Sequence, residues 1–378
     1  MKSVEYFKAF VSRNIDQLIY SLNPQKKSPF FPVRIHIEPT NTCNLRCVHC
    51  HHNDLGKSRP WTRNLGCMEL DVYKKIIDEI SEYGCEITLD NQGEPMLHKD
   101  FMEMVSYAKF KGVFTSVLTN GTRLSNDLSA KLIELKLDRI VFSFDSIIKE
   151  EYEKIRVGAN FETTLWNMMN YLKMNYEAGS PTFSTLSVIP QDLNESGLEK
   201  YRSFFESIPV SSIFFSSLLN LSGYSGISEE ITLDNLKCKS RKRPICRIPW
   251  ENIVINHDGE VSICPLDVNL SYSAGNVKDS SLLSIWNNRR YQDFRQGHLA
   301  GDYSKIEAAG DLCSQCNCLY DPEYDLQNYT EFSKNDLTRK AAQVFSKPKA
   351  AHDKKILKVK YETLIHIMDR FPESILEL

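Results

Sequence analysis

Short apolar runs alternate with amphipathic stretches along the first two thirds of the chain. The runs are rich in β-branched and aromatic residues, which is typical of buried strands, whereas the stretches between them space their apolar residues three or four apart, as helices do. Strands are predicted over Arg34–Glu38, Glu86–Asp90, Phe114–Thr119, Arg139–Phe144, Thr185–Ile189 and Ser212–Ser216. Helices are predicted over Leu70–Tyr83, Asp100–Lys111, Asn126–Leu135, Glu162–Glu177 and Glu195–Ser207.

This alternation predicts an α/β fold of right-handed βαβ units around a parallel sheet or barrel. About six units are present, fewer than the eight of a closed barrel, so we expect a partial (β/α)6 barrel. Residues that carry chemistry should then lie at the C-terminal ends of the strands.

The pattern changes after about residue 223. Asp258-Gly259 stands between two β-branched runs and predicts a hairpin over Asn252–Asn256 and Val261–Cys264. A helix is predicted next, over Leu282–Phe294. We therefore expect an N-terminal helix in 1–30, the barrel in 31–222, a cysteine-rich extension in 223–330 and docked helices in 331–378.

Composition excludes several classes of protein. The 378 residues carry a net charge of only −3, which does not suit a protein that binds mainly nucleic acid. No apolar run is long enough to span a membrane, and charged residues interrupt the apolar ones at the N-terminus, so no signal peptide is predicted. We expect a cytoplasmic protein without a membrane or nucleic-acid partner.

Eleven cysteines are unusual for such a protein, and in a reducing cytosol they favour metal binding over disulfides. Cys43, Cys47 and Cys50 have the spacing C-x3-C-x2-C directly after the first strand. Three thiolates in one loop can hold three corners of a [4Fe–4S] cluster and leave the fourth iron open to a small molecule. A zinc site with His49, His51 or His52 as fourth ligand is the alternative.

Further short motifs follow the next three strands, namely Gly93-Glu94-Pro95, Thr119-Asn120-Gly121 and Ser143-Phe144-Asp145, and Arg156 lies a little beyond. With the cysteine triplet, they resemble the radical S-adenosylmethionine (SAM) superfamily from about Arg34 to Cys318. The resemblance implies that Gly93, Glu94 and Pro95 contact the amino group of SAM and that Thr119, Asn120, Ser143 and Asp145 help to hold it. It also implies that Arg156 pairs with the methionine carboxylate. His49 stands where the family often has an aromatic residue against adenine, and Gln92 replaces the first glycine of a Gly-Gly-Glu motif.

A second group of cysteines lies in the extension. Cys246 and Cys264 flank the predicted hairpin with the spacing C-x12-G-x4-C, and Cys313-x2-Cys316 follows the helix. With Gly275-Asn276 and Trp286-Asn287, this pattern resembles the SPASM/twitch extensions that hold an auxiliary [4Fe–4S] cluster. These four cysteines are the expected ligands, although Cys318 competes with Cys316, and a zinc ribbon is the alternative.

The resemblance implies reductive cleavage of SAM to a 5′-deoxyadenosyl radical, which takes a hydrogen atom from a substrate carbon, with flavodoxin or ferredoxin as electron donor. We expect oxidation or epimerisation of a small polar molecule, such as a sugar or an aminocyclitol. For epimerisation Cys238 is a candidate hydrogen donor, although a lone cysteine is more often a small apolar residue.

Two alternatives remain open for the reaction. One is a SPASM-type enzyme that modifies a peptide or matures a partner enzyme, which we favour less because only 42 residues precede Cys43. The other is a non-catalytic iron–sulfur or zinc protein that acts as a redox sensor or scaffold.

Overall fold

The computed structural model describes residues 24–52, 61–189, 195–215, 245–303, 306, 312–313, 316 and 354–370. The chain divides into two compact units. The first unit joins Met1–Thr115 to Leu219–Glu331, and the second joins Ser116–Leu218 to Phe332–Leu378. Each unit therefore contains segments that lie far apart in the sequence.

The sheet of the first unit joins barrel strands to the extension. Strand β1 (Arg34–Ile37) pairs in parallel with β2 (Glu86–Leu89) on one side and with β7 (Asn252–Ile255) on the other. Strands β8 (Glu260–Ser262) and β9 (Ser273–Asn276) continue from β7 in antiparallel pairs. The parallel pairing of β1 with β7 attaches the cysteine-rich extension directly to the first barrel strand.

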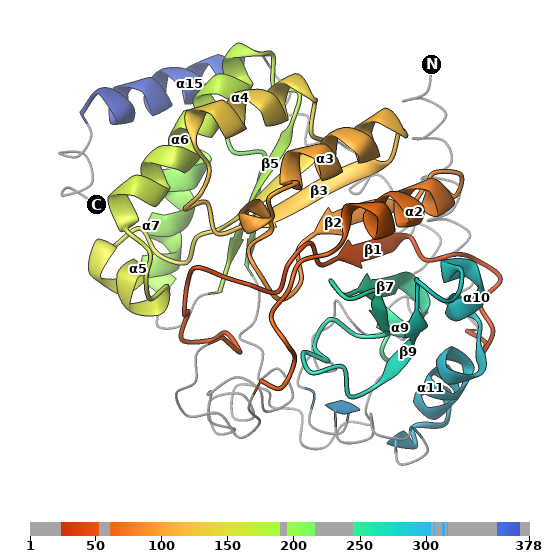
Figure 1. Ribbon diagram of the computed structural model, residues 1–378. Coiled ribbons are helices and arrows are strands. Elements are labelled where there is room, and N and C mark those ends of the chain that lie inside the picture. Colours follow the sequence, from red (N-terminus) through yellow and green to blue (C-terminus); the bar gives the residue numbers. More distant parts are fainter. Residues whose placement is uncertain are drawn as a thin grey trace, which may run out of the picture. The chain divides into compact units, whose positions relative to one another are not determined.

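In the described part of the first unit, the helices are α2 (Leu70–Ile80), the 3₁₀ helix η1 (Pro95–Leu97), α3 (Phe101–Phe110), α9 (Ile248–Glu251), α10 (Leu282–Trp286) and α11 (Arg289–Ala300), most of which are labelled in Figure 1. The single helix predicted over Leu282–Phe294 is wrong, because α10 and α11 are separate. Asn287 turns its side chain to the backbone of Ser28, and Asn288 caps α11 by accepting a hydrogen bond from the amide of Tyr291 at 3.0 Å. Asparagine at a helix N-cap favours such an interruption.

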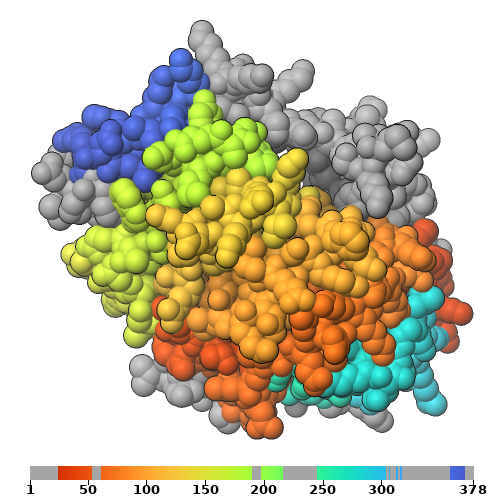
Figure 2. All heavy atoms as spheres, turned by 45° about the horizontal axis from the view of Figure 1, so that its top comes forward, coloured from red at the N-terminus to blue at the C-terminus, as the bar shows by residue number. Residues whose placement is uncertain are grey.

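The described residues of the second unit include parallel strands in the order β3-β4-β5-β6. They are β3 (Phe114–Thr119), whose first two residues belong to the first unit, β4 (Arg139–Ser143), β5 (Phe183–Val188) and β6 (Ser212–Phe215). The helices are α4 (Asn126–Glu134), α5 (Lys149–Ile155), α6 (Phe161–Glu177), α7 (Glu195–Glu206) and α15 (Lys354–Asp369). Helix α15, blue in Figure 2, packs against α6, where Tyr361 stacks on Tyr176 with ring centroids 4.3 Å apart.

Apart from the helix predicted over Leu282–Phe294, the predicted strands and long helices are confirmed to within two residues at each end, except that α2 ends at Ile80, three residues before the predicted Tyr83. The short elements α5, α9 and β9 were not predicted, because a few residues carry too little periodicity to be recognised. In the part of the chain that is described, no helix has the length and apolar character needed to cross a membrane.

Candidate functional site

The cysteine loop, residues 43–50, follows β1. Hydrogen bonds anchor residues 38–42, which form the approach from β1 to this loop. Thr40 donates its hydroxyl to the carbonyl of Gly66 at 2.7 Å and accepts the amide of Thr42 at 3.1 Å. Cys47 is buried, whereas Cys43 and Cys50 are half-buried. The loop is thus anchored before its first cysteine.

Gly93 packs directly onto the approach to the cysteine loop. A Cβ atom on Gly93 would lie only 2.2 Å from the carbonyl oxygen of Thr40 and 2.7 Å from that of Thr42. The next amide, that of Glu94, donates to the Thr42 carbonyl at 3.0 Å. The buried Glu94 carboxylate accepts the amide of Met96, at the start of η1, whose first residue is Pro95. Glycine at position 93 is therefore required by this close approach.

Aromatic rings gather beside the third cysteine. Nδ1 of His51 lies 3.7 Å from the sulfur of Cys50, and the His51 ring stacks on Trp61 with centroids 4.5 Å apart. His52 donates from Nε2 to the carbonyl of Gln92 at 2.5 Å. His49, the residue expected against adenine, is half-buried in the loop.

A buried carboxylate lies one residue after β1. Glu38 has no exposed side-chain surface and pairs with Arg63, whose Nη2 lies 2.5 Å from Oε1. The same carboxylate contacts His257 at 3.0 Å and accepts the side-chain amide of Asn91 at 2.9 Å. Burial alone would raise the pKa of Glu38, but hydrogen bonds from His257 and Arg63 outweigh that effect and hold the pKa below its ordinary value. Through Glu38, this network connects the segment that leads into the cysteine loop with His257 in the hairpin turn.

The remaining predicted SAM residues belong to the second unit. At the end of β3, Thr119 accepts the amide of Gly121 at 3.0 Å, and Asn120 accepts the amide and hydroxyl of Thr122. Both side chains therefore shape the turn that follows the strand. The short polar turn residues explain why the chain can reverse here.

Asp145 and Arg156, which sequence reasoning placed near SAM separately, form a buried ion pair. Nε of Arg156 lies 2.8 Å from Oδ2 of Asp145, and Oδ1 of Asp145 accepts the amide of Ile189 at 2.9 Å. Ser143, the last residue of β4, is half-buried. The Arg156 guanidinium is thus held by a protein carboxylate, and its pairing with a SAM carboxylate stays a prediction.

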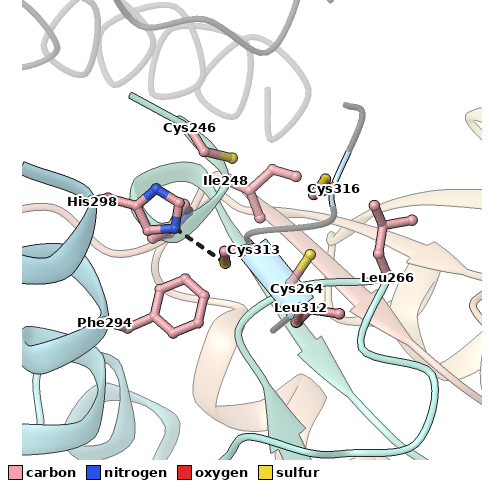
Figure 3. A pocket seen from close by; sticks show the side chains of 10 residues that line it. Cys246, Ile248, Cys264, Leu266, Phe294, His298, Leu312, Cys313 and Cys316 are labelled. Atoms are coloured by element: carbon pink, nitrogen blue, oxygen red, sulfur yellow. Dashed lines mark hydrogen bonds between the residues drawn. The ribbon is translucent and has the colours of Figure 1, made fainter. Parts of the chain in front are cut away.

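Four cysteines of the extension line one cavity, which we call the cysteine cavity (Figure 3). Cys246 precedes α9, Cys264 follows β8, and Cys313 and Cys316 come from a later segment. The other lining residues are Ile248, Pro249, Leu266, Phe294, His298 and Leu312. The structure thus brings the four predicted ligands together in one largely apolar space.

The electrostatics of the cysteine cavity suit a positively charged metal group. Burial raises the pKa of Cys246 to about 12, with the neighbouring Cys316 adding to the shift, and burial also raises the pKa of Cys264 well above its ordinary value. Four adjacent thiolates would repel one another in an apolar space, so they need cations to compensate them. An iron–sulfur cluster supplies those cations and accepts four cysteine ligands, so the residues fit such a group.

Side chains link the two cysteine sites within the first unit. The side-chain amide of Gln92 donates to the carbonyl of Pro265, which follows Cys264. The backbone carbonyl of Gln92 accepts a hydrogen bond from the His52 ring. Trp61 stacks on His51 and also packs against Val268 and Leu312 of the extension. Gln92 therefore has a specific structural role where it replaces a glycine of the motif.

Two predicted residues lie outside the described part of the chain, namely Cys238 and Cys318. Sequence reasoning missed Glu38, Arg63, Trp61 and His298. The position of Glu38 at the C-terminal end of the predicted strand Arg34–Glu38 was a usable signal. For Arg63 and His298 no local pattern was available, because their partners lie 25 and 15 positions away in the sequence.

Comparison with known proteins agrees with this geometry. The model of the radical SAM superfamily matches residues 37–204, and the model of SPASM, an iron–sulfur cluster-binding domain, matches residues 246–317. The second match covers the cysteine cavity.

Two curated relatives are similar over most of the chain. A tungsten-containing aldehyde ferredoxin oxidoreductase cofactor-modifying protein of Pyrococcus furiosus is 27% identical over 302 residues, which is 69% of this chain and 82% of that protein. The antilisterial bacteriocin subtilosin biosynthesis protein AlbA of Bacillus subtilis is 27% identical over 300 residues, or 68% of this chain. The chain spans 60% of the AlbA length.

A solved structure has the same fold. The crystal structure of Streptococcus suis SuiB bound to precursor peptide SuiA aligns with a TM-score of 0.58 at 14% identity, over 85% of this chain and 80% of that one. The predicted fold class, a partial barrel with a cysteine-rich extension, is thereby confirmed.

Proposed function

We propose, on the premise that this chain belongs to the radical SAM superfamily and carries a C-terminal SPASM domain, that its substrate is a peptide or a protein. When bound, SAM and the iron–sulfur clusters supply a 5′-deoxyadenosyl radical that removes a hydrogen atom from a substrate carbon. The protein binds and orients these groups and excludes water from them.

In this proposal the cysteine loop holds the first cluster through Cys43, Cys47 and Cys50. The SAM contacts are those predicted above: His49, Gly93, Glu94, Pro95, Thr119, Asn120, Ser143, Asp145 and Arg156. The auxiliary cluster is held by Cys246, Cys264, Cys313 and Cys316. A cytoplasmic location and a flavodoxin or ferredoxin electron donor belong to the same proposal.

The similarity to the Pyrococcus cofactor-modifying protein, which covers 82% of that protein, supports a role in the maturation of another enzyme. The similarity to AlbA, a bacteriocin biosynthesis protein, carries the peptide part of the proposal, because a bacteriocin is a peptide. Together these relatives favour a peptide or protein substrate over the sugar or aminocyclitol that was expected first.

The test compares two classes of substrate in one assay. The anaerobically reconstituted enzyme is given SAM, dithionite and either peptides encoded beside its gene or a panel of aminocyclitols and sugars. We expect 5′-deoxyadenosine to form above the basal rate only with a peptide, together with a change in that peptide's mass. Stimulation by an aminocyclitol or a sugar, with no peptide altered, would favour small-molecule oxidation or epimerisation.

A further inference from the structure

A histidine projects into the cysteine cavity from α11 (Figure 3). The His298 residue is 2% exposed, and its Nε2 lies 3.5 Å from the sulfur of Cys313, within hydrogen-bonding distance for a sulfur acceptor. The two residues are 15 positions apart, so the fold creates the contact. A ring nitrogen of His298 therefore faces the sulfur of an expected cluster ligand.

Neighbouring rings fix the orientation of His298. Its ring stacks on Phe294 with centroids 5.2 Å apart and meets Tyr303 nearly edge-on at 5.0 Å. The preceding Gly297 lets α11 pack closely against Ile306, because a Cβ atom at position 297 would lie only 2.3 Å from the Ile306 side chain. A ring held in this way loses little conformational freedom when a ligand occupies the cavity.

The surroundings make this contact electrostatically important. Apart from the cysteines and His298, the described residues that line the cavity are apolar: Ile248, Pro249, Leu266, Phe294 and Leu312. Among them, His298 alone has a side-chain N–H to offer a sulfur atom. A hydrogen bond is stronger in such a low-dielectric space than in water.

We propose that His298 is a positioning residue that donates its Nε2–H to the Cys313 thiolate of the auxiliary cluster and raises the cluster's reduction potential. The inference rests on the ligand set given under the proposed function, but not on the class of substrate. Reduction adds negative charge to the cluster and its sulfur ligands, so a donor to a ligand sulfur stabilises the reduced form.

The test isolates the auxiliary cluster. In a full-length variant with Cys43, Cys47 and Cys50 changed to Ala, the reduction potential of the remaining cluster is measured by electron paramagnetic resonance during a redox titration. His298→Phe removes the donor and keeps a ring against Phe294. It should retain the iron and shift the reduction equilibrium at least tenfold toward the oxidised form, which is about 59 mV for one electron.

Two further variants keep the test decisive. His298→Gln retains an N–H and should return the potential toward that of the parent, and Phe294→Leu changes the packing alone and should leave it close to the parent. An unchanged potential in His298→Phe would overturn the inference. So would loss of iron in both His298 variants, since His298 would then be a cluster ligand. Absence of iron from the parent variant itself would instead reject the proposed ligand set, and the inference with it.

Discussion

Arg63 places its guanidinium 2.5 Å from the carboxylate of Glu38, one residue beyond the strand that leads to the cysteine loop. Neither side chain is substantially exposed, and His257 of the hairpin turn contacts the same carboxylate. The pair connects three segments that the sequence separates widely. We expect the Glu38–Arg63 pair both to hold the cysteine loop in position and to stabilise the fold.

Arg63→Met is expected to lower the free energy of unfolding by about 3–5 kcal/mol, because it leaves the Glu38 charge buried without its arginine partner. Chemical denaturation of the loaded protein measures the change. Adding Glu38→Gln to Arg63→Met should recover part of the loss, since the buried charge is then gone. Glu103→Gln, which breaks an exposed pair with Lys74, should leave stability near that of the wild type. A loss no larger for Arg63→Met than for Glu103→Gln would contradict this role.

Gly93→Ala should displace the approach to the cysteine loop, because the new methyl group would meet the Thr40 and Thr42 carbonyls. We expect the iron content to fall from about eight toward about four per chain, since the first cluster is lost and the auxiliary one is kept. Gly301→Ala is the control. Gly301 has a φ of 64° and nothing within 4 Å of an added Cβ. Alanine there should lower the free energy of unfolding by about 1–2 kcal/mol and leave the iron content unchanged. Full iron content in Gly93→Ala would show that the contact does not position the loop.

His36 on β1 should make stability depend on pH. Burial lowers the pKa of His36, but the charge of Asp90 and its hydrogen bond, at 2.9 Å, outweigh burial and raise the pKa above the ordinary 6.5. The contribution of the His36–Asp90 pair to the free energy of unfolding is therefore fully present below pH 6.5, and it is lost as the pH rises through the folded-state pKa of His36.

Asp90→Asn tests this dependence. The difference in unfolding free energy between the wild type and the variant should be larger at pH 6 than at pH 9, because only the charged imidazole gains from the carboxylate. Denaturant titrations at the two pH values measure it. A difference that is the same at both would mean that His36 is not charged in the folded protein.

Sequence reasoning located the strands and long helices well, because buried β-branched runs such as Ile35 and Ile37 leave a clear pattern. It also grouped Cys246, Cys264, Cys313 and Cys316, which line one cavity, through the predicted hairpin and the C-x2-C spacing. It failed at Asn287 and Asn288, where hydrogen bonds of the two asparagine side chains interrupt a helical pattern. It failed at His298 too, since the identity of its partner depends on how α11 packs against a later segment.

Iron and acid-labile sulfide counts on the anaerobically reconstituted protein test the two-cluster account most directly. The wild type should hold about eight irons per chain, and the variant with Cys43, Cys47 and Cys50 changed to Ala about four. Cys85→Ala, which removes a buried thiol outside both groups, should keep about eight. About four irons in the wild type and none in the triple variant, or zinc in place of iron, would contradict the account.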